Sequence, residues 1–358
     1  MAGIFGMLGI SDTDRAYVST IGQSVVYEVA QRYIAAHNEQ MTAIERVFVE
    51  RETEDYAIRY KLPGGGRLQR RGGQAQSGAV KASGSWDVGL PLEDFGAQVA
   101  GDDVTLAYMT VQELQIHLDT VLNQDVNTRR YEMLKALLNN TARTFVDPLW
   151  GSITVRPLAL ASDSVVYPPV LGSETEATDT HHIESNYTAA NISDTNNPLV
   201  TIVDELEEHF GSGTGGENIV VFINNAQTAK IKALSDFDEV VDRFIRVGDG
   251  VSVPANLPMV PGKIIGRGSG AWVVEWRHIP ANYMIAIHME EPAPLLKRVD
   301  PADTGLGRGL QLVSREVNYP LVQAHYRNRF GIGVGNRLNG VVMELGVGGT
   351  YSIPSGYS

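Results

Sequence analysis

The fold of this chain is decided by its C-terminal stretch Val322-Gln-Ala-His-Tyr-Arg-Asn-Arg-Phe-Gly-Ile-Gly-Val334. Apolar side chains occupy the even positions and polar residues or glycines the odd ones, with Asn328 as the exception. Such alternation predicts a long β-strand with one buried face. Asn336 to Gly340 supplies turn residues, so we expect Val341 to Leu345 to return as the partner strand. Three arginines are expected to point outward, away from the buried face: Arg327, Arg329 and Arg337.

The longest predicted helix begins at Thr110. Thr110-Val-Gln-Glu113 is a capping-box pattern, in which the threonine accepts a helical amide and the glutamate reaches back to the threonine amide. Apolar residues at three- and four-residue spacing continue the helix to about Ala142. At ~1.5 Å per residue the helix is roughly 50 Å long. We expect it to be the spine of a domain and the even face of the C-terminal strand to pack under it.

The remaining elements alternate between helices and strands. Segments 51–62 and 80–90 flank a tip rich in Gly and Arg and predict a long exposed hairpin. Since an isolated ribbon is marginally stable, we expect it to lie on another surface. Further helices are expected at 12–37, 39–47, 199–210 and 226–234, and further strands at 218–224, 263–267, 271–275 and 283–289, which makes the fold class α+β.

Composition narrows the classes of protein. The 358 residues are 43% hydrophobic and 20% charged, which is typical of a folded chain. No run approaches the ~18 apolar residues that a membrane span requires, and the N-terminus lacks the basic start of an export signal. Because there is no cysteine, disulfides and thiolate metal sites are excluded.

The charge is unevenly distributed. Of the net charge of −13, a balance of −12 lies in residues 161–250, which hold sixteen Asp or Glu against four Lys or Arg. Segments 51–90 and 306–345 are mildly basic. Two interpretations remain open: solvated surfaces that keep the protein soluble, or acidic and basic patches that meet between copies. Sustained nucleic-acid binding is disfavoured, because the overall field repels phosphate.

Motifs for catalysis are weak. Gly211 to Gly216 has the spacing of a dinucleotide fingerprint, but it follows a helix and precedes a strand, the reverse of what phosphate binding requires. His181-His182 with Glu184 suggests a metal, yet the segment reads as a polar surface loop without helical ligand spacing. We therefore expect no catalytic residue, no cofactor and no bound metal, and we expect that the protein is not an enzyme.

Two stretches carry a family resemblance: Arg329-Phe-Gly-Ile-Gly-Val-Gly-Asn-Arg-Leu-Asn-Gly-Val-Val342 and the run from Pro261 to Met289. With the order of the elements, they resemble the major capsid proteins of tailed bacteriophages that have the HK-ninety-seven-type fold. The resemblance implies an N-terminal arm (1–51), an extended loop (52–96), a peripheral domain (97–146 and 301–358, with the spine helix at 110–142) and an axial domain (147–300).

The resemblance also implies a function. Such a protein assembles with itself into the pentamers and hexamers of an icosahedral or prolate head that encloses double-stranded DNA without sequence-specific contact. It would be found in the virion after assembly in the host cytoplasm, away from membranes, with a separate scaffolding protein, a portal and a decoration protein as further partners. An encapsulin-like shell of a bacterial nanocompartment is the alternative, and an α+β hydrolase or binding module is the rival from another class.

Candidate residues follow from this implied role. Some members of the family form an isopeptide bond between an extended-loop lysine and an asparagine of the closing strands, which here would join Lys81 to Asn336 or Asn339. Ordinary contact and turn roles are the alternative for these three residues. We expect Arg329→Glu to impair assembly more than folding. The candidates for contacts between subunits are Arg67, Arg70, Arg71, Lys81, Arg327, Arg329 and Arg337.

Overall fold

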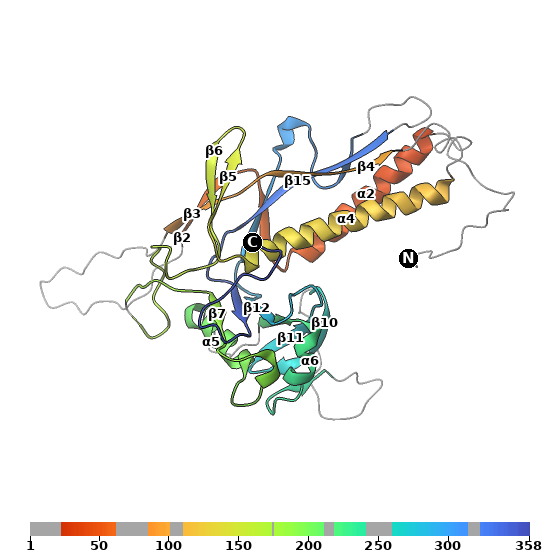
Figure 1. The fold of residues 1–358 in the computed structure, drawn as a ribbon. Coiled ribbons are helices and arrows are strands. Elements are labelled where there is room, and N and C mark those ends of the chain that lie inside the picture. Colours follow the sequence, from red (N-terminus) through yellow and green to blue (C-terminus); the bar gives the residue numbers. More distant parts are fainter. Residues whose placement is uncertain are drawn as a thin grey trace, which may run out of the picture.

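The computed structural model describes residues 23–61, 85–100, 110–173, 175–210, 218–240, 260–313 and 323–358. Two sheets organise these residues (Figure 1): two helices lie along the first, and the second forms the lower lobe with two further helices. Among the helices within these ranges, none combines the length and apolarity needed to span a bilayer. The helices are α2 (Gln23–Glu45), α4 (Val111–Leu138), α5 (Pro198–Phe210) and α6 (Asn225–Ile231).

The first sheet is built around the strand that the alternation predicts. This strand, β15, pairs antiparallel with β13, β14 and β4, and β1 adds in parallel to β13. The even-numbered residues Phe330, Ile332 and Val334 pack against the second half of α4, as expected. The strands are β1 (Val49–Thr53), β4 (Glu93–Ala100), β13 (Leu295–Val299), β14 (Gln311–Leu312) and β15 (Gln323–Val334).

The second sheet has the order β7-β16-β12-β8-β11-β10-β9. Its central strand β8 is buried at every residue, because α4 and β15 lie over one face and α5 and α6 over the other. A continuous apolar run is what a strand covered on both faces requires. The strands are β7 (His182–Glu184), β8 (Ile219–Ile223), β9 (Asp238–Glu239), β10 (Lys263–Gly268), β11 (Ala271–Glu275), β12 (Tyr283–His288) and β16 (Val341–Glu344).

Two hairpins project from the sheets. The first joins β2 (Ala57–Lys61) to β3 (Ser85–Gly89) and confirms the base of the expected long hairpin. Its tip lies outside the described residues. The second joins β5 (Arg143–Asp147) to β6 (Gly151–Val155) and stands beside the first (Figure 1).

Both long helices differ slightly from their predicted lengths. The capping box of α4 is present, with the Thr110 hydroxyl accepting from the Glu113 amide and the Glu113 carboxylate accepting from the Thr110 amide. The helix ends at Leu138 instead of about Ala142. Helix α2 runs without interruption to Glu45, so the two helical stretches expected at 12–37 and 39–47 are one helix over the part described.

The expected pairing of the two C-terminal strands is wrong. Strand β16 does not pair with β15 but enters the second sheet between β12 and β7. Residues 335–340 therefore cross from one sheet to the other. Strand β13, within the predicted axial domain, belongs to the first sheet, and β16, within the predicted peripheral domain, belongs to the second, while the domain bounds themselves stay a prediction.

Glycine is required on β15 where another segment crosses it. A Cβ at Gly331 would lie 1.8 Å from the Pro91 carbonyl oxygen. The odd-numbered face is thus covered at this point by residues 89–92, instead of facing solvent.

Buried charges join α2 and α4 to the first sheet. The Arg129 guanidinium, 1% exposed, donates to Asp125 (2.8 Å), to Glu45 (3.1 Å) and to the side chain of Asn38. Asn328, the exception in the alternation, donates to Asp125 at 2.6 Å. We call this set the Arg129 network, and its members are Asn38, Glu45, Asp125, Arg129, Lys297 and Asn328, with Lys297 bonded to Glu45 at 2.6 Å.

Candidate functional site

Arg337 lies inside the subunit, so the expectation that it points outward is wrong. Its side chain is fully buried, and its guanidinium donates to the carbonyl oxygens of Pro157 and Leu158 and pairs with the Asp163 carboxylate. The same group stacks over the ring of Tyr167, 5.6 Å from the centroid. Because its hydrogen bonds are made within the chain, Arg337 attaches the 157–167 loop to the crossing at 335–340.

Arg327 and Arg329 lie on the odd-numbered face of β15, as expected, and are partly exposed. Arg327 donates to the Leu306 carbonyl oxygen at 3.1 Å, and Arg329 pairs with Asp300 at 3.2 Å. Since Asp300 is buried, Arg329→Glu would place two carboxylates together inside the subunit. The ion pair gives Arg329 a role within the subunit as well, and the greater effect of Arg329→Glu on assembly than on folding stays a prediction.

The two candidate asparagines are buried. The Asn339 side chain accepts from the His288 amide and donates to the carbonyl oxygens of His288 and Pro292, each at 2.9 Å. Asn336 donates to the same Pro292 carbonyl at 3.1 Å. Both amides are thus held by hydrogen bonds within the subunit, and the cross-link to Lys81 stays a prediction. The remaining candidates, Lys81, Arg67, Arg70 and Arg71, lie outside the described residues.

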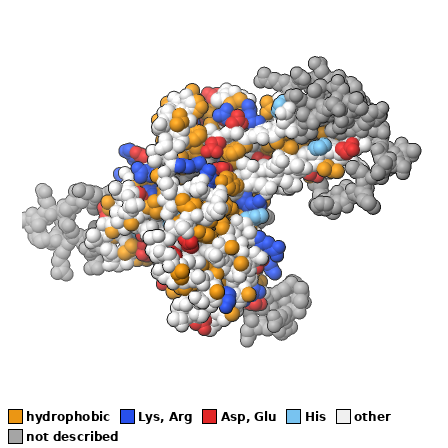
Figure 2. All heavy atoms as spheres, viewed as in Figure 1, with side chains coloured by type: hydrophobic (Ala, Val, Ile, Leu, Met, Phe, Trp, Pro, Cys, Tyr) orange, Lys and Arg blue, Asp and Glu red, His pale blue; other side chains and the backbone are white. Residues whose placement is uncertain are grey.

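Apolar side chains are exposed at the tip of the β5–β6 hairpin. Leu149 is 84% exposed, Val146 70% and Trp150 56%. The Trp150 ring stacks on Tyr56, with the centroids 4.5 Å apart and the planes 11° from parallel. Hydrophobic side chains are visible at the top of the view in Figure 2, where Figure 1 draws this hairpin. An apolar hairpin tip that projects into water is typical of a contact surface. We call these four residues the hairpin patch.

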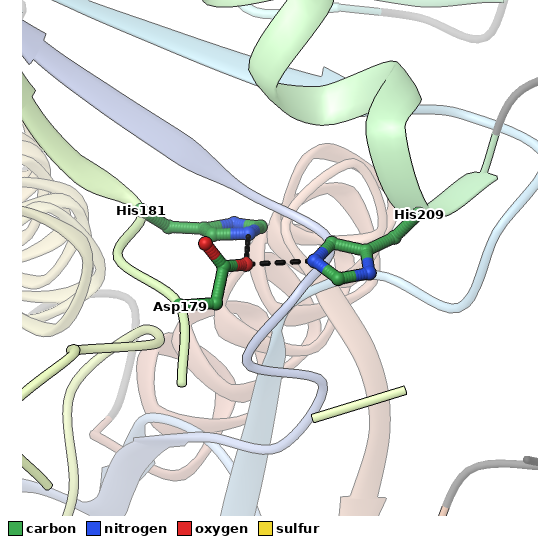
Figure 3. Close-up of side chains that lie close together, drawn as sticks. All are labelled: Asp179, His181 and His209. Carbon is green, nitrogen blue, oxygen red and sulfur yellow. Dashed lines mark hydrogen bonds and ion pairs between the residues drawn. The ribbon is translucent and has the colours of Figure 1, made fainter. Parts of the chain in front are cut away.

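A cluster of titratable side chains lies between the segment that precedes β7 and helix α5, in the lobe of the second sheet. His181 and His209 both approach one carboxylate oxygen of Asp179, at 2.9 Å and 2.7 Å between Nε2 and Oδ2 (Figure 3). His181 is fully buried, and His209 and Asp179 are nearly so. The expectation that His181 and His182 lie in a surface loop is wrong, because both side chains are buried and His182 is the first residue of β7.

Helix α5 supplies the rest of this cluster. Glu205, Glu208 and His209 follow one another at i, i+3 and i+4, the spacing that places side chains on one helical face. The carboxylate oxygens of Glu205, Glu208 and Asp179 all lie within 4.8 Å of one another. Sequence reasoning missed Asp179, for which there was no local signal, and it missed Glu205, Glu208 and His209, whose spacing on a predicted helix was one. We call Asp179, His181, Glu205, Glu208 and His209 the histidine cluster.

The environment shifts the acid–base properties of this cluster. Burial raises the pKa of Glu205 to about 7, and the charges of Glu208 and Asp179 add to that effect. Burial alone would raise the pKa of Asp179, but its hydrogen bonds with His181 and His209 lower it overall. His182 differs: its Nε2 faces the Leu137 carbonyl oxygen, and burial lowers its pKa to about 3, so it stays neutral.

Comparison with known proteins gives a match in structure only. No family model matches the sequence, and no curated protein matches it. A chain of Mycobacterium phage Patience is 20% identical, with a TM-score of 0.66 over 100% of this chain and 99% of that chain. The likeness confirms the expected α+β fold of the HK-ninety-seven type.

Two further structures are less similar. A chain from the capsid of the cyanophage P-SCSP1u has a TM-score of 0.48 at 10% identity, covering 83% of this chain and 86% of that chain. A chain from the mature capsid of bacteriophage PhiM1 has a TM-score of 0.47 at 10% identity, covering 84% and 86%.

Proposed function

We propose that this chain is the major capsid protein of a tailed phage, a subunit that assembles with itself into the closed shell around packaged double-stranded DNA. The observation that carries this proposal is the end-to-end likeness in fold to a chain of Mycobacterium phage Patience. The match covers 100% of this chain and 99% of that chain. The role is structural, and no residue is assigned a catalytic step.

The hairpin patch supports self-assembly independently of that likeness. Leu149 is among the most exposed large apolar side chains of the described residues. Covering such side chains with another surface is favourable, by roughly 25 cal/mol per Å² of apolar area removed from water. Contacts that are individually weak become strong together when each subunit makes several of them at once. We infer that the patch is covered by another copy in the shell.

The finer parts of the proposal concern geometry and partners. The first sheet with α2 and α4 would form the peripheral part of the subunit, and the second sheet the part that gathers around five-fold and six-fold axes. The base of the β2–β3 hairpin would be the start of an extended loop that lies over a neighbour. A separate scaffolding protein, a portal and a decoration protein remain candidate partners, the virion the proposed location and the host cytoplasm the proposed place of assembly.

Electron microscopy of the purified protein tests the proposal. Closed shells of uniform size are expected under assembly conditions, because contacts that repeat with icosahedral symmetry close on themselves. Dispersed monomers under those conditions would contradict it. Shells that copurify with an enzyme cargo in place of DNA would favour the encapsulin-like alternative.

A matched pair of variants tests the hairpin patch. Leu149→Asp should leave the subunit folded, because the side chain is 84% exposed, but should reduce the yield of closed shells at least tenfold. Leu149→Met keeps the apolar character and should assemble like the unmodified chain. Normal shells from Leu149→Asp would remove the patch from the proposed contacts.

A further inference from the structure

The histidine cluster brings three parts of the chain together. The segment before β7 contributes Asp179 and His181, and the C-terminal end of α5 contributes Glu205, Glu208 and His209. In Figure 3 the rings of His181 and His209 approach the Asp179 carboxylate from different elements. The third part is the crossing between the sheets, whose Gly340 carbonyl oxygen lies 2.9 Å from His181 Nδ1.

We propose that the histidine cluster is a binding site for one divalent transition-metal ion, with zinc as the preferred ion. The ligands are Nε2 of His181, Nε2 of His209 and a carboxylate oxygen of Asp179, with Glu208, whose Oε1 lies 3.5 Å from His209 Nε2, as the fourth. Two imidazoles and two carboxylates form the mixed nitrogen and oxygen set that four-coordinate zinc accepts. The chain has no cysteine, so a thiolate ligand is excluded and the site has to be built from nitrogen and oxygen.

The contact between His181 and Gly340 supports a ligand role for His181. Because a carbonyl oxygen only accepts, Nδ1 carries a proton and orients the ring, while Nε2 donates to Asp179 Oδ2 in the ion-free structure and would release that proton when it binds the metal. A metal-binding histidine commonly donates its other ring N–H to a backbone carbonyl or a carboxylate, which fixes its orientation. His182 serves as an internal contrast, since its Nε2 is directed away from the cluster, at Leu137.

Charge balance also favours a cation. The cluster holds three carboxylates and two imidazoles. Among the described residues, the ion pairs of Asp179 and Glu208 come from His181 and His209, and no lysine or arginine takes part. Burying carboxylates without a compensating cation is unfavourable. A divalent ion compensates most of this charge, and Glu208, which is 32% exposed, gives it a path from solvent.

The geometry needs a small adjustment to hold the ion. Ligands at ~2.0 Å from a tetrahedral ion lie about 3.3 Å from one another. The Nε2 to Oδ2 distances here are 2.9 and 2.7 Å, so these atoms would separate by roughly half an ångström. Metal binding would then connect α5, the segment before β7 and, through Gly340, the crossing between the sheets.

Metal analysis of tag-free protein tests the proposal. The chain is stripped with a chelator, equilibrated with micromolar Zn²⁺ alone, dialysed and analysed for zinc by mass spectrometry. One zinc per chain and a raised melting temperature are expected. Less than about a tenth of an equivalent in folded protein would overturn the site. Because zinc content is measured on subunits or shells alike, this result does not depend on whether the chain forms a capsid.

Variants locate the ion. His209→Gln and Glu208→Gln should each weaken zinc binding, by about tenfold or more for the histidine, while circular dichroism shows that the chain is still folded. His278→Gln is the control, since His278 is an exposed histidine of the same lobe and should leave the zinc content unchanged. Should His209→Gln fail to fold, Glu208→Gln in folded form decides. An unchanged zinc affinity in either folded cluster variant would overturn the assignment.

Discussion

The two sheets of this protein are stabilised in different ways. The central strands of the second sheet are apolar, with a hydrophobic cluster on each face. The first sheet holds buried charges: the Arg129 network joins it to both long helices, and Arg298 pairs with Asp147 at 2.7 Å. The difference teaches that apolar packing tolerates small changes, whereas a buried charge depends on each of its partners.

The largest effect is expected from removing the centre of the network. Arg129→Met leaves Asp125 and Glu45 buried with fewer cations, and should lower the free energy of unfolding by about 3–5 kcal/mol. Denaturant unfolding of unassembled subunits measures this. Arg129→Lys keeps the charge but not the planar guanidinium, so its stability should lie between that of the unmodified chain and that of Arg129→Met. A loss below about 1 kcal/mol for Arg129→Met would show that the network contributes little.

Acid should weaken the first sheet through the same network. Burial alone raises the pKa of Asp125, but hydrogen bonds from His37 and Asn328 and the Arg129 charge lower it overall. A lowered pKa in the folded state adds stability above the unfolded value of about 3.9, and that stability is lost as the pH falls through the folded value.

Thermal unfolding between pH 5 and pH 2 is the measurement. The unmodified chain should lose stability more steeply than Asp125→Asn, which has no carboxyl at this position to protonate. Equal slopes in the two proteins would show that Asp125 does not contribute to the acid response.

Shortening a buried side chain in the second sheet should have a moderate effect on stability. Ile285→Val removes one methylene from a fully buried side chain of β12 and should cost about 0.5–1.5 kcal/mol. The same denaturant experiment measures it, and its dependence on pH should match that of the unmodified chain because no titratable group changes. A loss as large as that of Arg129→Met would remove the contrast between the sheets.

The smallest effect is expected where a charge pair lies in solvent. Arg32 and Glu28 pair on α2 with side chains that are 78% and 64% exposed. Arg32→Gln should change the free energy of unfolding by about 0.3–0.5 kcal/mol at most. A loss above about 1 kcal/mol would mean that exposure does not separate weak charge pairs from strong ones in this protein.

Sequence reasoning was reliable where neighbours along the chain decide the structure. The alternation in β15, the capping box at Thr110 and the apolar run of β8 each report a local requirement for one buried face, a satisfied helix end or two covered faces. These requirements are met within a few residues, so they can be read directly from the order of side chains. Even Asn328, the break in the alternation, marked the point where the network reaches β15.

Only the tertiary structure decided which distant segments meet. Asn336 to Gly340 has the composition of a hairpin turn, yet it crosses between sheets because Asn339 and Arg337 bond to residues about 50 and 180 positions away. Nor does composition reveal that Arg337 is buried, or that Asp179 and His181 meet His209. Alternation determines which face of a strand is buried. The hydrogen-bonding edges of all strands are alike, however, so the choice of partner strand follows from packing across the whole chain.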